Sequence, residues 1–173
     1  GQILVEVDYR AYHVLTTGYC AEDASYMRMA RLDMHSFVAG CFTGDWKPEI
    51  MEEDDASLVD RFRWFKSDPD RKRVRDKQAK PSILGVGFGM GARRLYQENL
   101  EHFAGEKTAK RFLDLLQHLF PRVFDWQRRI RQQAHDQTFL KSPCGHLRRF
   151  YEVFVWDYKS ASYKNGDQAE EAV

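Results

Sequence analysis

Three side chains at four-residue intervals could together bind a nucleotide. Lys80, Leu84 and Phe88 occupy positions i, i+4 and i+8, so a helix would place them on one face. That face would offer a positive charge, then an apolar surface, then an aromatic ring. A nucleoside triphosphate suits this order, because its phosphates bind cations while its sugar and base need flat apolar contact. The spacing favours a nucleotide site, although an amphipathic helix with a basic end is also an ordinary structural arrangement.

The run around these residues, AKPSILGVGFGMGARRL, resembles motif B, the fingers helix of family A DNA polymerases. In that motif a lysine is followed at four-residue steps by an apolar or aromatic residue and then by an aromatic residue with glycine. The matching positions here are Lys80, Leu84, Phe88 and Gly89. The resemblance implies that Lys80 binds the triphosphate and that Leu84 and Phe88 contact the sugar and the nascent base pair. Leu84 stands where many relatives have Phe or Tyr, so it keeps the apolar contact without the ring.

A second departure concerns the arginine that the family carries four residues before this lysine. That position is Asp76, while Arg75 lies one residue earlier and Pro81 directly follows the lysine. Proline inside a helix removes an N–H and clashes with the preceding turn. We therefore expect a kink or a one-residue bulge near Pro81, which would bring Arg75 back onto the phosphate-binding face. A regular helix would instead leave that role to Arg73 or Lys77.

The first residues, Gln2 to Tyr9, are predicted to form a short buried strand that ends at Asp8. A buried carboxylate is costly unless it is paired or metal-bound, and capping the next helix is its more frequent role. However, VEVDYRAYHVL resembles motif A of the same family. This implies that Asp8 binds both catalytic Mg²⁺ ions and that the carbonyl of Tyr9 helps to hold one. His13 stands where the family has a glutamate that excludes a ribose 2′-hydroxyl. It would therefore line the dNTP site, and the selectivity of that site between deoxyribose and ribose stays open.

Two further runs match the same family in the expected order. LDMHSF resembles the D-I-H element that follows motif A, which implies that His35 contacts the triphosphate. LFPRVFDW resembles the Y-F-P-x-V-x-x-W signature between motif B and the palm, and Pro121 is expected to begin a helix there. The triplet His135-Asp136-Gln137 is similar to motif C, H-D-E, but it follows that signature too closely. We interpret it as the end of a helix.

The remaining elements are predicted from capping and turn residues. Helices are expected from Tyr12 to Tyr26 with an interruption around Gly18, after Asp33, around Ala56 to Phe65, from Arg93 to Phe103 and from Glu106 to Phe120. Residues 138–151 are predicted to form a β-hairpin that turns at residues 143–145. This hairpin resembles the family's G-R-R hairpin, which implies that Arg148 and Arg149 contact phosphates of primer-template DNA.

The composition describes one soluble unit. Of 173 residues 43% are hydrophobic, enough for a core, and the net charge of +1 means that nucleic-acid binding would depend on local basic clusters. Three scattered cysteines, Cys20, Cys41 and Cys144, form neither a disulfide framework nor a zinc knuckle and favour a reducing compartment. No run is long and apolar enough to span a membrane, and the first residues lack signal-peptide features. We expect a monomer with no membrane partner in the cytoplasm of a bacterial or phage-infected cell.

The resemblance implies an α+β fold, predominantly α: fingers helices with an N-terminal palm strand and a β-hairpin near the C-terminus. Residues 1–40 would be a palm segment, 41–70 a variable connector, 71–125 the fingers and 126–173 the return to the palm. The implied activity is template-directed transfer of a nucleotide from a dNTP to a primer 3′-hydroxyl in DNA replication with two Mg²⁺ ions. The chain alone is expected to be inactive, because motif C lies beyond it. A non-catalytic helical nucleic-acid-binding module and a single-subunit RNA polymerase remain alternatives.

Overall fold

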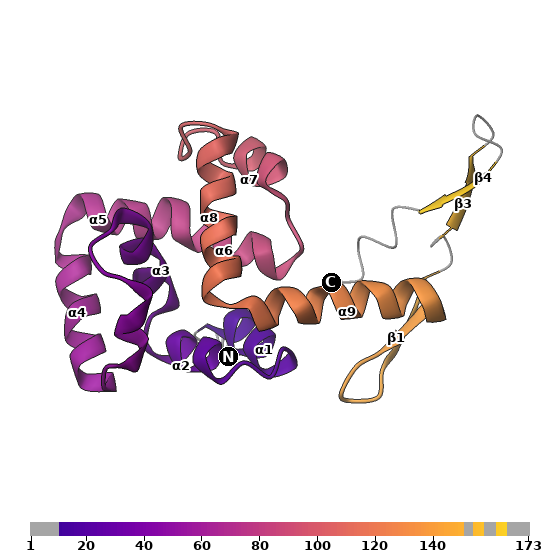
Figure 1. The fold of residues 1–173 in the computed structure, drawn as a ribbon, viewed down its shortest axis with the longest axis horizontal. Helices are drawn as coiled ribbons and strands as arrows, with labels where there is room; N and C mark the ends of the chain where they lie inside the picture. The colour runs from indigo at the N-terminus through magenta and orange to yellow at the C-terminus, as the bar shows by residue number, and fades with distance from the viewer. Residues whose placement is uncertain (1–10, 151–153, 158–161, 166–173) are drawn as a thin grey trace, which may run out of the picture.

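The computed structural model describes residues 11–150, together with the backbone of residues 154–157 and 162–165. The predicted strand Gln2 to Tyr9, with Asp8, lies outside the described residues. Within them the chain is predominantly helical, and its strands form two small antiparallel hairpins toward the C-terminus (Figure 1). A mostly helical fold with a little β-structure was the prediction, and it is confirmed at this level.

The first three helices are α1 (Tyr12–Cys20), α2 (Ala24–Leu32) and α3 (Met34–Thr43). Aspartates begin the second and third: Asp23 accepts the backbone N–H of Tyr26 at 2.9 Å, and Asp33 accepts that of Ser36 at 3.1 Å. Aspartate at this position satisfies an N–H that the helix itself leaves unpaired. The helix predicted after Asp33 is confirmed.

The predicted interruption around Gly18 was wrong in position. Gly18 lies inside α1, and the break comes later, where Glu22 adopts a left-handed φ of 53° before Asp23 begins α2. A Cβ added at Gly18 would lie 2.8 Å from side-chain atoms of both Met27 and Tyr26. Glycine is therefore needed here for the close approach of α2 to α1 rather than for a break in the helix.

The middle of the chain contains a short 3₁₀ turn, η1 (Pro48–Glu52), followed by α4 (Asp55–Ser67) and α5 (Pro69–Val74). The prediction of a short helix around residues 56–65 is confirmed, with a helix slightly longer at both ends. Next come a π-helical turn, η2 (Arg75–Ala79), and α6 (Lys80–Gly87). The segment from α5 through η2 to α6 is one continuous helical path.

Three helices follow: α7 (Ala92–Glu98), α8 (Glu106–Leu119) and α9 (Pro121–Gln137). The predicted helix to Phe103 ends early, at Glu98. The Asn99 side chain donates to the carbonyl of Leu95 at 2.9 Å and so satisfies an acceptor at the helix end. The helix start at Pro121 and the interpretation of residues 135–137 as a helix end are both confirmed.

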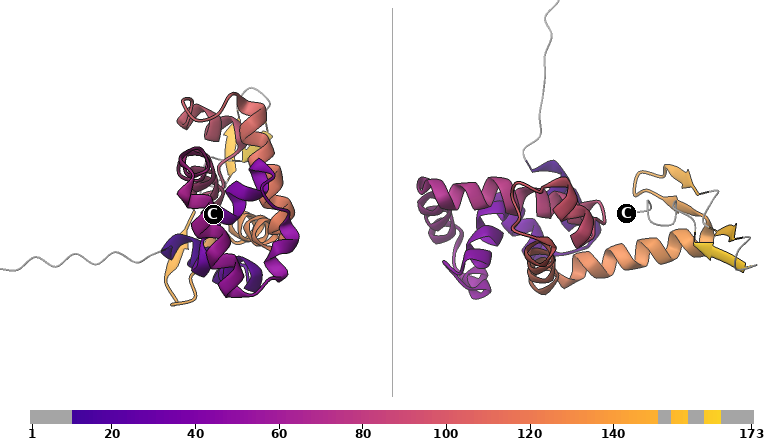
Figure 2. Two further views of the ribbon diagram at one scale, coloured as in Figure 1. Left: turned by 90° about the vertical axis from the view of Figure 1, so that its left-hand side faces the viewer. Right: turned by 90° about the horizontal axis from the view of Figure 1, so that it is seen from above.

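Helix α9 leads away from the other helices to the strands (Figures 1 and 2). Figure 2 shows the hairpins at the end of α9 opposite to the helical body. Strand β1 (Phe139–Lys141) pairs with β2 (Leu147–Arg149), and β3 (Phe154–Asp157) pairs with β4 (Ser162–Asn165). The first hairpin was predicted, and its turn contains Gly145 at a φ of 88°, a conformation that glycine adopts easily.

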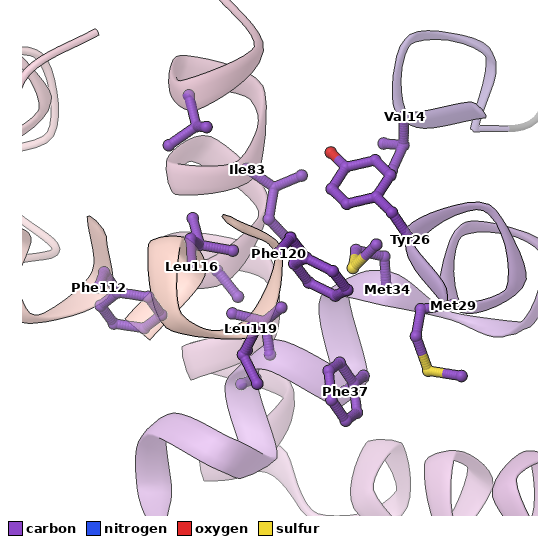
Figure 3. Close-up of a cluster of buried hydrophobic side chains, with 14 of the residues drawn as sticks. Val14, Tyr26, Met29, Met34, Phe37, Ile83, Phe112, Leu116, Leu119 and Phe120 are labelled. Carbon is purple, nitrogen blue, oxygen red and sulfur yellow. The ribbon is translucent and has the colours of Figure 1, made fainter. Parts of the chain in front are cut away.

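The core joins the first three helices to the junction of α8 and α9. Phe120 lies at that junction with 1% of its surface exposed. Its ring meets Tyr26 edge to face at a centroid distance of 4.8 Å and meets Phe37 at 6.2 Å. Figure 3 shows Phe120 between residues of α2 and α3 and the last turn of α8. Burying rings of this size supplies much of the stability of a core. The core therefore fixes α3 against α8 and α9.

No helix in the described ranges has the length and apolar character needed to cross a lipid bilayer.

Candidate functional site

The π turn η2 changes the register of the helix just before Lys80. The N–H of Lys80 donates to the carbonyl of Arg75, five residues earlier instead of four. Pro81 follows in the first turn of α6, where it lacks the N–H that a regular helix would use. One extra residue in the turn means that positions five apart, and not four apart, return to one face. The predicted bulge is confirmed, and a regular helix from Lys77 to Leu84 is excluded.

Arg75 points from this turn toward the start of α3. Its Nε donates to Ser36 Oγ at 3.0 Å, and its Nη2 lies 3.2 and 3.3 Å from the two carboxylate oxygens of Asp33. Its Nη1 donates to the neighbouring carboxylate of Asp76. A guanidinium has five N–H groups. These contacts engage all three nitrogens of the Arg75 guanidinium.

Arg75 and Lys80 line a cavity of about 180 Å³ with His35. We call this the basic cavity; its other lining residues are Ala11, Val14, Ala30, Asp33 and Met34. The three residues predicted to contact a triphosphate are thus brought together from α3, η2 and the start of α6. Their phosphate-binding role stays a prediction.

His35 is electrically unusual within this cavity. Burial, together with the positive charges of Arg75 and Lys80, lowers the pKa of its imidazole to about 4, although Asp33 and Asp76 act in the opposite direction. The ring is therefore neutral at pH 7. Its Nε2 is buried and has no hydrogen-bond partner among the described residues. Such an atom is costly to bury unless a ligand or water bonds to it, so it marks this side of the cavity as suited to a polar ligand.

A second, apolar cavity of about 130 Å³ adjoins the first. His13, Leu84 and Phe88, the residues predicted to contact the sugar and base, all line it, and Val14 lines both cavities. The rings of His13 and Phe88 meet edge to face at a centroid distance of 6.0 Å. Phe88 is 65% exposed, so its ring is available to a ligand. Lys80 thus lines the basic cavity, and Leu84 and Phe88 line the cavity next to it.

The two arginines predicted to contact DNA lie elsewhere. Arg148 and Arg149 are exposed on β2, at the end of α9 far from the helical body (Figure 1). The guanidinium of Arg148 lies 5.2 Å from the ring centre of Phe150. The structure does not bring these arginines to either cavity, and their DNA contacts stay a prediction.

The predicted metal site falls outside the structure. Asp8 and Tyr9 are not among the described residues, and within residues 11–150 no group of three or more His, Cys, Asp or Glu side chains could hold a metal ion. The binding of two Mg²⁺ ions therefore stays a prediction.

Sequence reasoning missed the polar network behind the basic cavity. Asp33, Ser36 and Lys66 all contribute to it, and Lys66 comes from α4, a segment to which no chemistry was assigned. The Asp33 and Lys66 side chains meet at 2.9 Å although they lie 33 residues apart in the chain. No spacing in the sequence could have indicated this pair.

Comparison with models of known protein families finds none that matches the chain, and comparison with curated proteins finds no match.

Proposed function

We propose that this chain forms the fingers and adjoining palm segments of a DNA polymerase similar to family A. The observation that carries the proposal is the π turn, which sets Arg75 on the face of Lys80 beside His35. In the proposed complex the triphosphate of a dNTP occupies the basic cavity. Its sugar and base then contact His13, Leu84 and Phe88 along the adjoining apolar cavity.

The residues of the basic cavity have complementary roles in this proposal. Lys80 is exposed and supplies a point charge, whereas Arg75 presents a planar guanidinium that Ser36 and Asp33 hold in place at the cavity. Neutral His35 can donate to a phosphate oxygen only through the ring nitrogen that carries its hydrogen, and a bound anion would also raise the pKa of the ring and favour the imidazolium. Together these groups orient the α-phosphate for attack by a primer 3′-hydroxyl, and Mg²⁺ bound by Asp8 would supply the remaining charge stabilisation.

The decisive experiment is calorimetric titration of a dNTP into the 173-residue chain, with and without Mg²⁺. We expect Lys80→Ala to weaken binding by roughly tenfold or more, because a charge-assisted hydrogen bond contributes about 1.5–3 kcal/mol. Lys77→Ala is the matched control: Lys77 is exposed in the same turn and lines neither cavity. Its variant should bind like the parent. Equal losses from both changes, or no binding by the parent, would contradict the proposal.

A second candidate is a helical nucleic-acid-binding module without catalytic activity. The exposed arginines of α9 and β2, Arg128, Arg129, Arg148 and Arg149, favour it. It predicts DNA binding that falls steeply with salt and is unaffected by nucleotide or by Lys80→Ala. A preference for NTPs over dNTPs in the same titrations would instead support an RNA polymerase, since His13 lies at the predicted sugar gate.

A further inference from the structure

Asp33 is a buried carboxylate that accepts from four different donor groups. Its side chain is 5% exposed. It accepts the backbone N–H and the hydroxyl of Ser36, at 3.1 and 3.0 Å, and the ammonium of Lys66 at 2.9 Å. The guanidinium of Arg75 lies farther away, at 3.2 and 3.3 Å from the two oxygens. Asp33 thus makes its shortest charged contact with Lys66, and Arg75 is bound less tightly.

These contacts also lower the pKa of Asp33. Burial alone would raise that pKa, but the hydrogen bond from Lys66, the charge of Arg75 and the N–H of Ser36 together outweigh it. Asp33 is therefore ionised at neutral pH. A buried negative charge that lines the basic cavity opposes the binding of any anion there, unless another group neutralises it.

The charged residues that line the basic cavity sum to one positive charge, and Asp76, which pairs with Arg75 but does not line the cavity, cancels that charge. Arg75 and Lys80 are cations, Asp33 and Asp76 are anions, and His35 is neutral at pH 7. Lys66 supplies the surplus positive charge, although it does not line the cavity. Lys66 is part of α4, and its ammonium donates to Asp33 Oδ2 at 2.9 Å.

We propose that Lys66 is a positioning residue for the basic cavity: by neutralising Asp33 it leaves Arg75 available to an anion and makes the cavity positive. That the anion is a triphosphate rests on the proposed function, whereas the charges assigned to these residues do not. Without Lys66, Asp33 would hold Arg75 in a tight two-oxygen pair, the geometry that guanidinium and carboxylate favour. In this proposal Lys66 sets the charge of the basic cavity although it lies outside the cavity, on α4, between the chain segments that contribute His35 and Arg75.

The first readout is the electrostatic potential in the basic cavity, measured before any ligand is added. The pKa of His35, followed by NMR titration of its ring signals, reports the potential in the cavity, because Arg75, Asp33, Lys80 and Asp76 all act on it. We expect Lys66→Met to raise this pKa, since Asp33 would lose its nearest counter-charge. Lys66→Arg should keep the parent value. Lys107→Met is the control, an equal loss of charge at an exposed position of α8.

The second readout is calorimetric binding of inorganic tripolyphosphate, which carries the phosphates without sugar or base. Lys66→Met should weaken binding by roughly two- to fivefold, within the range for a partly exposed charge near a site. Adding Asp33→Asn to Lys66→Met should restore it, because asparagine still caps α3 but carries no charge. Thermal melts of each variant establish that it is folded.

The outcomes separate the two proposals. A His35 pKa that Lys66→Met leaves unchanged, in a folded protein, would overturn the role of Lys66 whatever binds. Failure of Asp33→Asn to restore tripolyphosphate binding would also overturn it, since the loss would then be structural. If the pKa moves as expected while the parent binds no tripolyphosphate or dNTP, the charge assignment stands and the polymerase proposal fails.

Discussion

Replacing Gly40 by alanine is expected to lower the free energy of unfolding by about 3 kcal/mol. A Cβ at this position of α3 would lie 2.0 and 2.1 Å from ring atoms of Trp46. The ring cannot move aside easily: its Nε1 donates to the carbonyl of Phe37 at 2.9 Å, and it packs against Phe62 and Phe65. Overpacking and the lost hydrogen bond together outweigh the roughly 1 kcal/mol that alanine gains over glycine in a helix.

Urea unfolding of the Gly40→Ala protein measures this effect, and Gly87→Ala is its control. Gly87 is also helical, but a Cβ there would meet only Thr17 Oγ1, at 3.9 Å. This second change should leave stability unchanged or raise it by up to about 1 kcal/mol, from helix propensity alone. Similar stability of the two variants would show that α3 and Trp46 do not pack as described.

Between pH 7 and pH 4.5, the free energy of unfolding of the parent is expected to fall by about 2 kcal/mol more than that of His35→Gln. Burial and neighbouring cations lower the pKa of His35 to about 4, whereas an unfolded histidine titrates near 6.5. Between these values the unfolded chain binds a proton that the folded chain does not. Unfolding is therefore favoured as the pH falls through this window, and the contribution of His35 is fully present only above it.

Urea unfolding of the parent and His35→Gln at both pH values checks this prediction. His118→Gln, a change at an exposed histidine of α8, serves as the control and should follow the parent. A parent whose stability varies with pH no more than that of His35→Gln would mean that His35 is not held neutral in the basic cavity. The cavity would then lack the buried imidazole on which its proposed chemistry partly depends.

Local signals predicted the fold where one residue type constrains the backbone. Asp33 marked the start of α3 because a carboxylate caps helices, and Pro121 marked the start of α9 because proline suits a first turn. The π turn could be predicted because Pro81 cannot continue a regular helix. Gly18 was misinterpreted because glycine permits two different structures, a break in a helix and the close packing of one helix against another. Only the position of α2 decides between them.

The site could be predicted only as far as local spacing and the family resemblance allowed. Those placed Lys80, Leu84 and Phe88 on one face, and the structure shows them along two adjoining cavities. Lys66 and its contact with Asp33 could not be predicted, since both residues have ordinary local roles and meet only after α4 packs near α3. The contacts of Asp8 lie outside the described residues, so the metal chemistry stays a prediction from resemblance.

The π turn also implies that this part of the chain can lose a residue. Its five-residue turn contains one residue more than a regular helix needs for the same rotation. Deleting Lys77 in a Pro81→Ala background should therefore produce a continuous α-helix that still presents Arg75 and Lys80 on one face. Deleting Leu84 in the same background would rotate everything that follows. Thermal melting should show a shift of a few degrees for the first deletion and loss of cooperative folding for the second.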